Sequence, residues 1–315
     1  MESFPCRTSG VQRLIMTGDS SSAARRAVSA SSAVGGHTER WVPYAFLVPA
    51  LIFVLGILGY GVVSGFITSL HSTDPFTYVT TFAGFRTYLE LFRSPRFQNS
   101  LLRSTYLVLG SVALGMLVSM TFGLCLNQLR RVRTAIRGVS LVPWMVSGIA
   151  AAMMFRFMFS GNVGLVRFFT TEPVTWTGHP VRAMVVLILT NTWYISPFST
   201  LILFSGLQTI DPTFYDAAAV DGASPIQVLF RLTIPLIKPM IGVALIWLSF
   251  ASFNMFDVVL PITAGGPGRA TEVLALVMYR FAFNELNYPM ATAIMMTLLI
   301  INVGLSVVYL KLFKM

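Results

Sequence analysis

The sequence predicts an all-α membrane protein with six transmembrane helices, and three observations lead to this fold class. Of the 315 residues, 55% are apolar and only 11% are Asp, Glu, Lys or Arg, against about 25% charged residues in an ordinary soluble domain. The mean hydropathy is +0.73. The apolar residues also fall into six long blocks, and a helix needs about 20 residues to cross the hydrocarbon core of a bilayer.

The six blocks give the expected domain organisation. The first block is too long, and starts too late, to be a secretory signal peptide, whose apolar region has about 7–15 residues. Residues 1–40 are rich in Ser and Ala and too poor in apolar side chains to pack, so we expect a disordered tail with its start at Met1 or Met16. Residues 41–315 form the transmembrane domain, with spans at about 44–70, 101–129, 138–160, 183–206, 239–262 and 286–311.

The distribution of basic residues predicts the orientation. Arg130, Arg131, Arg133 and Arg137 lie in one short loop without an acidic residue between them. By the positive-inside rule this loop is cytoplasmic. With six spans both termini are then cytoplasmic, in a multi-pass protein of the inner or plasma membrane. The net charge of +10 could suggest nucleic-acid binding, but the placement of the basic residues indicates membrane orientation instead.

The sequence contains none of the patterns that a membrane enzyme or a metal protein would need. Its two cysteines, Cys6 and Cys125, are far apart and form no C-x-x-C motif. Its three histidines are isolated from one another and from carboxylate clusters, and there is no H-E-x-x-H or G-x-S-x-G pattern. We expect no enzymatic activity and no metal site in this chain.

The loop at 207–239 is predicted to form two short helices joined by a glycine. Asp211 is placed to cap a helix that begins at Pro212, and Gly222 is placed to end it in the left-handed conformation. Ser224 and Gln227 have the spacing of a capping box for a second helix, which we expect Pro235 to end. Such an elbow could dock into a partner protein or cap its own helical bundle, and the residues alone leave both open.

This loop resembles a signature of the integral-membrane subunits of ATP-binding-cassette (ABC) importers. The signature is Glu-Ala-Ala, three residues, Gly, nine residues, Ile, one residue, Leu-Pro. Here the spacing is kept by Asp216-Ala217-Ala218, Gly222 and Leu232-x-Ile234-Pro235, with Asp for Glu, Leu for Ile and Ile for Leu. The segment Thr263-Ala264-Gly265-Gly266-Pro267 looks like the sugar-importer branch, and the likeness extends from about residue 42 to the C-terminus.

The resemblance implies the type I importer permease fold, in which the elbow is a cytoplasmic coupling helix seated on an ATPase. Partners implied are a second, similar permease, an ATPase dimer, an extracytoplasmic substrate-binding protein and a sugar-like solute. ATP and Mg would bind to the ATPase, which agrees with the absence here of any Lys after Gly, and hence of a P-loop. The coupling residues implied are Tyr215, Asp216, Ala217, Ala218, Asp221, Gly222, Ala223 and Pro235.

Polar and kink-forming residues inside spans four and five indicate where a solute would pass, because such residues tend to line cavities. Asn191, Tyr194 and Phe198 share one helical face, beside Pro197. The alternative is helix packing, with Asn and Ser as interhelical hydrogen-bond partners. The candidate solute-path residues are Asn191, Tyr194, Ile195, Phe198, Ser252, Asn254, Met255 and Asp257, and for all except Asn254 and Asp257 the resemblance implies alignment with sugar-contacting positions.

Asp257 is the only acidic residue within a predicted span. It lies near the outer end, which favours pairing or a place at the pore mouth over a proton relay; Arg156 is a candidate partner by charge alone. Two amphipathic stretches, 85–92 and 274–281, are expected to lie flat at the outer membrane interface, with contact to a binding protein as a compatible alternative.

Three functions can be compared. A permease subunit of an ATP-driven, binding-protein-dependent importer for a sugar or related polyol fits best. A free-standing ion-coupled transporter would usually have inverted repeats and several ionisable groups within its spans, and we find neither. A membrane enzyme would need a set of catalytic residues, and the sequence contains none of the patterns named above. The sequence does not name the solute.

Overall fold

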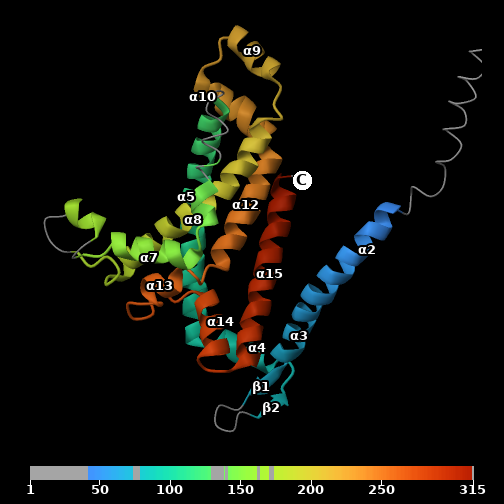
Figure 1. Ribbon diagram of the computed structural model, residues 1–315, viewed down its shortest axis with the longest axis vertical. Coiled ribbons are helices and arrows are strands. Elements are labelled where there is room, and N and C mark those ends of the chain that lie inside the picture. The colour runs from blue at the N-terminus through green and yellow to red at the C-terminus, as the bar shows by residue number, and fades with distance from the viewer. Residues whose placement is uncertain are drawn as a thin grey trace, which may run out of the picture. The chain divides into compact units, whose positions relative to one another are not determined.

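The structure is a computed structural model, and it describes residues 42–73, 79–128, 138, 141–161, 164–169 and 174–313. The predicted tail 1–40, the arginine loop 130–137 and Lys314 lie outside these residues. The chain divides into two units, Met1–Val63 and Ser64–Met315, which we describe separately. Within the described residues nearly all regular structure is helical (Figure 1).

The first predicted span, 44–70, is helical up to Ser69. It begins as α2 (Val42–Val54), passes through the π-helical turn η1 (Leu55–Gly59) and continues as α3 (Tyr60–Ser69), which crosses the boundary between the units. Its apolar part, Leu47–Ser69, has 23 residues, enough to cross a membrane.

A short hairpin follows α3 at the start of the second unit. Strand β1 (His71–Thr73) pairs with β2 (Thr80–Phe82) in antiparallel register, with His71 opposite Phe82. The Thr87 hydroxyl of the next helix, α4 (Arg86–Arg93), donates to the His71 carbonyl at 2.7 Å. This bond joins the hairpin to the helical body.

Four long helices form the body of the second unit. They bury small and polar residues between them: the Ser119 hydroxyl, for example, donates to the Ser196 carbonyl at 3.1 Å. Small side chains at such contacts allow helices to approach closely inside a membrane. The four are α5 (Pro95–Gln128), α8 (Pro180–Leu207), α12 (Lys238–Phe253) and α15 (Tyr288–Phe313).

The elbow and the shorter helices occupy the two ends and one side of this body (Figure 1). The elbow begins with α9 (Pro212–Val220), followed by α10 (Pro225–Gln227), the π-helical η3 (Val228–Thr233) and α11 (Ile234–Leu236). Further helices are α7 (Gly148–Met158), η2 (Leu165–Phe169), α13 (Val259–Thr263) and α14 (Leu274–Phe283), and the described residues 141–145 are helical as well.

Among the residues that the structure describes, length and composition do not confirm all six predicted spans. Four helices among the described residues have the length and composition to cross a membrane, or five if Pro225–Leu236 and Lys238–Phe253, which meet at a 75° bend, count as one broken span. In the predicted third span, α7 has only 11 residues, because the backbone turns to an extended conformation at Ser147 and a new helix starts there.

The predicted fifth span, 239–262, is also not one continuous helix. Helix α12 ends at Phe253 and α13 starts at Val259. The Asn254 side chain donates to the Phe250 carbonyl at 2.8 Å, and this kind of side-chain bond competes with the backbone ladder. The solute-path residues after Phe253 therefore lie on a non-helical link.

The prediction that the apolar face of residues 274–281 lies against the membrane interface is wrong. In α14, Leu274 and Val277 are buried and pack in a core cluster with Phe97 and Ile294. The tertiary structure covers this apolar face with α5 and α15, so it does not face lipid. At α4, in contrast, Phe85, Leu89 and Phe92 are exposed, and interfacial placement of that helix stays a prediction.

Candidate functional site

The elbow begins with the predicted cap. The Asp211 carboxylate accepts hydrogen bonds from the backbone N–H and the hydroxyl of Thr213, at 2.9 and 2.8 Å. Both bonds favour the charged carboxylate, and the backbone bond is the larger cause that holds the pKa of Asp211 below its usual 3.8. Pro212 follows at the first helical position, where no N–H is needed.

Gly222 forms the corner of the elbow, as predicted. Its φ of +69° is left-handed, and a Cβ added there would meet nothing within 4 Å. The N–H of Gly222 bonds to the Ala219 carbonyl and that of Ala223 to the Ala218 carbonyl, which is the Schellman pattern of helix ends. The requirement for glycine is therefore one of backbone conformation and not of space.

The second arm starts with the predicted capping box but does not end where we expected. Ser224 and Gln227 bond reciprocally, side chain to backbone N–H. Pro235 does not stop the helix: the π-helical η3 precedes it and α11 runs through it to Leu236. The hydrogen-bond pattern changes from π to α at this junction, and a residue without an N–H is tolerated there. The bend comes two residues later, before Lys238.

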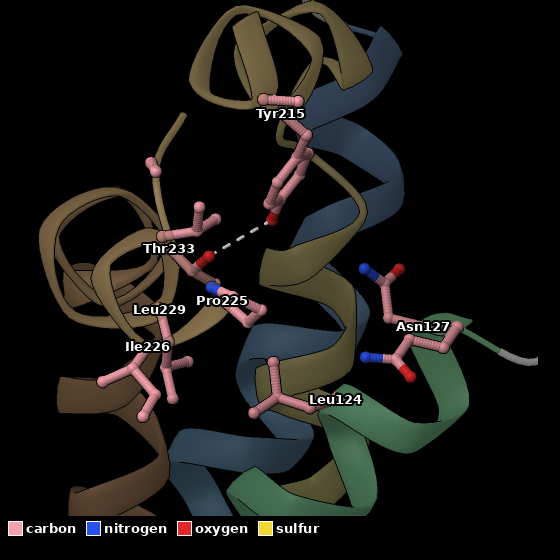
Figure 2. A pocket seen from close by; sticks show the side chains of 11 residues that line it. Leu124, Asn127, Tyr215, Pro225, Ile226, Leu229 and Thr233 are labelled. Carbon is pink, nitrogen blue, oxygen red and sulfur yellow. Dashed lines mark hydrogen bonds between the residues drawn. The ribbon is translucent and has the colours of Figure 1, made fainter. Parts of the chain in front are cut away.

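A cavity of about 580 Å³ lies between the elbow and the end of α5 (Figure 2). Tyr215 points into it, with its hydroxyl 3.5 Å from that of Thr233, and Leu124 and Asn127 line it from α5. Tyr215 thus contacts the elbow's own second arm. Of the other predicted coupling residues, Ala218 and Ala223 are half-buried, and Asp216, Ala217, Asp221, Gly222 and Pro235 are exposed.

The exposed side of the elbow carries apolar side chains that the sequence analysis did not single out. Val220 is 89% exposed, Ile226 71% and Phe230 63%. Ile226 and Phe230 are four residues apart, the spacing that places side chains on one helical face. An exposed apolar surface at the end of a bundle is typical of a protein contact site.

Asn191 and Ser252, from the predicted solute path, meet deep inside the bundle. The Asn191 amide nitrogen donates to the hydroxyls of Ser111 and Ser252, at 2.9 and 3.0 Å, and joins α8 to α5 and α12. All three residues are buried. The Asn191 amide oxygen is buried without a hydrogen-bond partner among the described residues. In this conformation the network packs helices together and retains one free polar atom.

Tyr194 is half-buried on α8, and two tryptophans that we did not predict lie against Phe198 of the same helix. Phe198 is half-buried, and its ring centroid lies 4.4 Å from that of Trp247 and 5.4 Å from that of Trp144. The Trp247 indole N–H donates to the Ile195 carbonyl at 3.3 Å, which fixes its ring. We name Trp144, Phe198 and Trp247 the aromatic trio.

The trio could not be derived from spacing, because its members come from three separate segments of the chain. Ile195, beside it, is itself buried. Along α8 and α12, Phe198 and Trp247 lie on the same side of the Asn191–Ser252 pair, toward the elbow. Rings in this arrangement can stack on the apolar face of a sugar.

The link between α12 and α13 holds the last three candidates. Met255 is buried, Asn254 is exposed and Asp257 is half-buried. The Asp257 carboxylate lies against Gly148 in the first turn of α7, where a Cβ would come within 2.8 Å of the carboxyl carbon. A helix N-terminus favours a negative charge. No ion pair joins Asp257 to Arg156, which donates instead to the Pro261 carbonyl at 2.9 Å.

Comparison with known proteins identifies the family. Residues 111–311 match the family described as the binding-protein-dependent transport system inner membrane component. This match covers more than half of the chain. It includes the elbow, Asn191, the link and the four long helices, except residues 95–110 of α5 and 312–313 of α15.

The chain belongs to this family of inner membrane transport components.

Individual relatives agree with the family match. The chain is 31% identical over 279 residues to the trehalose/maltose transport system permease protein MalF of Thermococcus litoralis, covering 87% of this chain and 94% of that protein. It is 30% identical over 283 residues to the sulfoquinovosyl glycerol transport system permease protein SmoG of Agrobacterium fabrum (88% and 91% covered). The sn-glycerol-3-phosphate transport system permease protein UgpA of Salmonella typhimurium is 30% identical over 277 residues (86% and 93%).

Solved structures share the fold. A chain of a bacterial ABC transporter that imports the acidic polysaccharide alginate superposes with a TM-score of 0.73, covers 88% of this chain and 96% of that one, and is 21% identical. A second structure, of an alginate ABC transporter in complex with an alginate pentasaccharide-bound periplasmic protein, gives a TM-score of 0.72 at 21% identity. This family member therefore has the fold of an ABC importer permease.

Proposed function

We propose that the chain is the transmembrane permease subunit of an ATP-driven, binding-protein-dependent importer for a sugar or a related polyol. The observation that carries the proposal is the family match over residues 111–311. The relatives named above, whose names include trehalose/maltose, sulfoquinovosyl glycerol and sn-glycerol-3-phosphate, support the solute class. The chain supplies half of the translocation path, and a second, similar permease supplies the other half.

The membrane arrangement belongs to the same proposal. The chain crosses the inner membrane six times, with the broken α12–α13 segment and the segment around α7 counted as spans, and both termini are cytoplasmic. Residues 1–40 form a separate cytoplasmic tail ahead of the transmembrane domain 41–315. The support for the orientation is the arginine loop and the positive-inside rule.

The elbow is proposed to couple this chain to an ATPase dimer. Its exposed apolar residues Val220, Ile226 and Phe230 would seat in a groove of the ATPase, as amphipathic helices do in partner grooves. The caps at Asp211 and Ser224 and the corner at Gly222 make the elbow stiff enough to transmit movement. ATP and Mg bind to the ATPase, and this chain performs no catalysis.

Transport is proposed to proceed by alternating access. When the ATPase dimer closes, the elbows of both permeases move with it and the helical bodies turn the path outward. A substrate-binding protein then delivers solute at the outer end, and reopening of the dimer turns the path inward. Asn191 and Ser252 would exchange their mutual bond for bonds to solute hydroxyls, and the free oxygen of Asn191 provides an acceptor for such a group.

Reconstitution tests this function. The chain should accumulate solute in proteoliposomes only together with a second permease, an ATPase and a substrate-binding protein, and only with ATP. Trehalose, maltose and sn-glycerol 3-phosphate are suitable first probes. Uptake by the purified chain alone, driven by an ion gradient, would instead establish the free-standing carrier.

A further inference from the structure

Glu272 is a buried carboxylate that the transport mechanism above does not use. Its side chain is 2% exposed, and it follows the loop that leaves α13. One of its carboxylate oxygens, Oε1, accepts from Arg280 of α14 and, at 3.1 Å, from Arg96 of α5. The Nε of Arg269 lies 3.8 Å from the other carboxylate oxygen of Glu272, and the Arg269 side chain is 66% exposed. A buried charge persists only where it is paired and hydrogen-bonded. Here Arg280 lies eight residues along the chain, and Arg96 comes from a distant segment.

Arg280 connects this carboxylate to α13. One terminal nitrogen of its guanidinium donates to Glu272, and the other donates to the Ala264 carbonyl at 2.7 Å. A guanidinium holds its donors in a rigid fork, so the bond to Glu272 fixes the direction of the bond to Ala264. Ala264 ends α13 in the left-handed conformation, with φ 45°.

A second arginine, on helix α7, also bonds to α13. Arg156 of α7 donates to the Pro261 carbonyl at 2.9 Å. The last carbonyls of a helix have no partner within the helix, and cations there also interact favourably with the helix dipole. The end of α13 is thus held between α7 and α14. We name Arg156, Glu272 and Arg280 the α13 clamp.

The clamp bears on the predicted solute path because α13 is packed into the core beside it. Val259 and Ile262 of α13 are buried and belong to the same apolar cluster as Met255. The link that carries Met255 and Asp257 leads directly into α13. If α13 lifts from the body, this end of the path must move with it.

We infer that Glu272 is a positioning residue, whose buried carboxylate aims Arg280 at α13 and thereby keeps the Met255–Asp257 end of the path closed. The inference that this segment borders a solute path rests on the proposed function. The clamp itself rests on contacts within this chain.

Thiol labelling of a buried reporter tests the clamp. In the full chain in membranes, Cys6 and Cys125 are replaced by Ser, and Val259→Cys provides a reporter in α13 that is 0% exposed. The rate of its reaction with N-ethylmaleimide measures opening of α13, since a buried thiol reacts only when the segment opens locally. Glu272→Gln removes the charge of the clamp, and labelling should become about tenfold faster or more, because breaking a buried pair is strongly destabilising.

Three controls make the result decisive. Arg280→Lys keeps the positive charge but not the forked donors, and it should also speed labelling. It tests the clamp even if the Glu272→Gln chain does not insert into the membrane. Arg269→Gln, at the exposed arginine, should leave the rate unchanged. Leu126→Cys, a reporter buried to 1% exposure near the elbow end of α5, should stay unreactive in every variant.

Unchanged labelling at residue 259 in both Glu272→Gln and Arg280→Lys would overturn the inference. Faster labelling at both residue 259 and residue 126 would overturn it as well, because it would show general loosening. The assay needs neither solute nor ATP, so its outcome is separate from the reconstitution test. A chain that fails to transport can still have the clamp, and a chain that transports can lack it.

Discussion

At the scale of single residues, Gly222 is the position where backbone conformation most directly supports the proposed coupling. Its φ is +69° and the space around it is open, so a substitution there acts only through backbone strain. For an L-residue this conformation costs about 1–2 kcal/mol, and Asn tolerates it best. We predict that Gly222→Val greatly lowers ATP-driven uptake while Gly222→Asn retains most of it. Equal uptake by both variants would contradict the role of the elbow corner.

A substitution at Asn191 tests whether this side chain packs helices together or contacts the solute. Asn191→Ala removes the donor to Ser111 and Ser252, and the net loss for such bonds is about 0.5–1.5 kcal/mol each. We expect uptake to change, seen as an altered KM or maximal rate, while the partner permease and ATPase still co-purify with the chain. Ser199→Ala, at a buried serine outside the path, is the matched control. Loss of co-purification with Asn191→Ala alone would favour the packing role.

At the scale of elements, the aromatic trio joins α8, α12 and the segment before α7. Trp247 lies on α12 toward the elbow from Ser252, and its indole is tied to α8 through the Ile195 carbonyl. We predict that Trp247→Leu slows solute uptake several-fold, because a stacking surface is lost. The loaded binding protein should still stimulate ATP hydrolysis, because coupling is kept.

The matched control for the trio is Trp176→Leu, which removes a tryptophan whose ring packs against Phe159. It should leave uptake near the wild-type rate. If both substitutions slow uptake equally, or if Trp247→Leu abolishes ATP hydrolysis as well, the trio has a structural role and no specific contact with solute.

At the scale of the whole molecule, orientation decides whether the elbow can reach an ATPase. Val220 at the elbow is 89% exposed, and Phe283 at the end of α14 is 68% exposed. In a chain without its native cysteines, we predict that Val220→Cys reacts with a membrane-impermeant maleimide only from the cytoplasmic side, and Phe283→Cys only from the outer side. The reverse pattern would contradict the proposed function.

Local sequence was sufficient to predict the features that depend on neighbouring residues. The Asp211 cap and the Ser224–Gln227 capping box follow from side chains two or three positions from the backbone groups they satisfy. The left-handed Gly222 follows from the absence of a Cβ at that residue. Long apolar blocks likewise predicted α5, α8 and α15 to within a few residues, except that α5 begins six residues earlier than expected. The substrate-path and coupling roles stay predictions.

The tertiary structure decided what depends on contacts between distant segments. The sequence could not show that α14 is covered, that Pro235 is accommodated after a π-helical turn, that the fifth block breaks after Phe253, or that Phe198 meets two tryptophans. By itself the sequence determined that this is a helical membrane protein with a capped elbow, because hydrophobicity and capping act along the chain. Only the tertiary structure placed Glu272 among three arginines, because the free energy of a buried charge depends on the partners that folding brings to it.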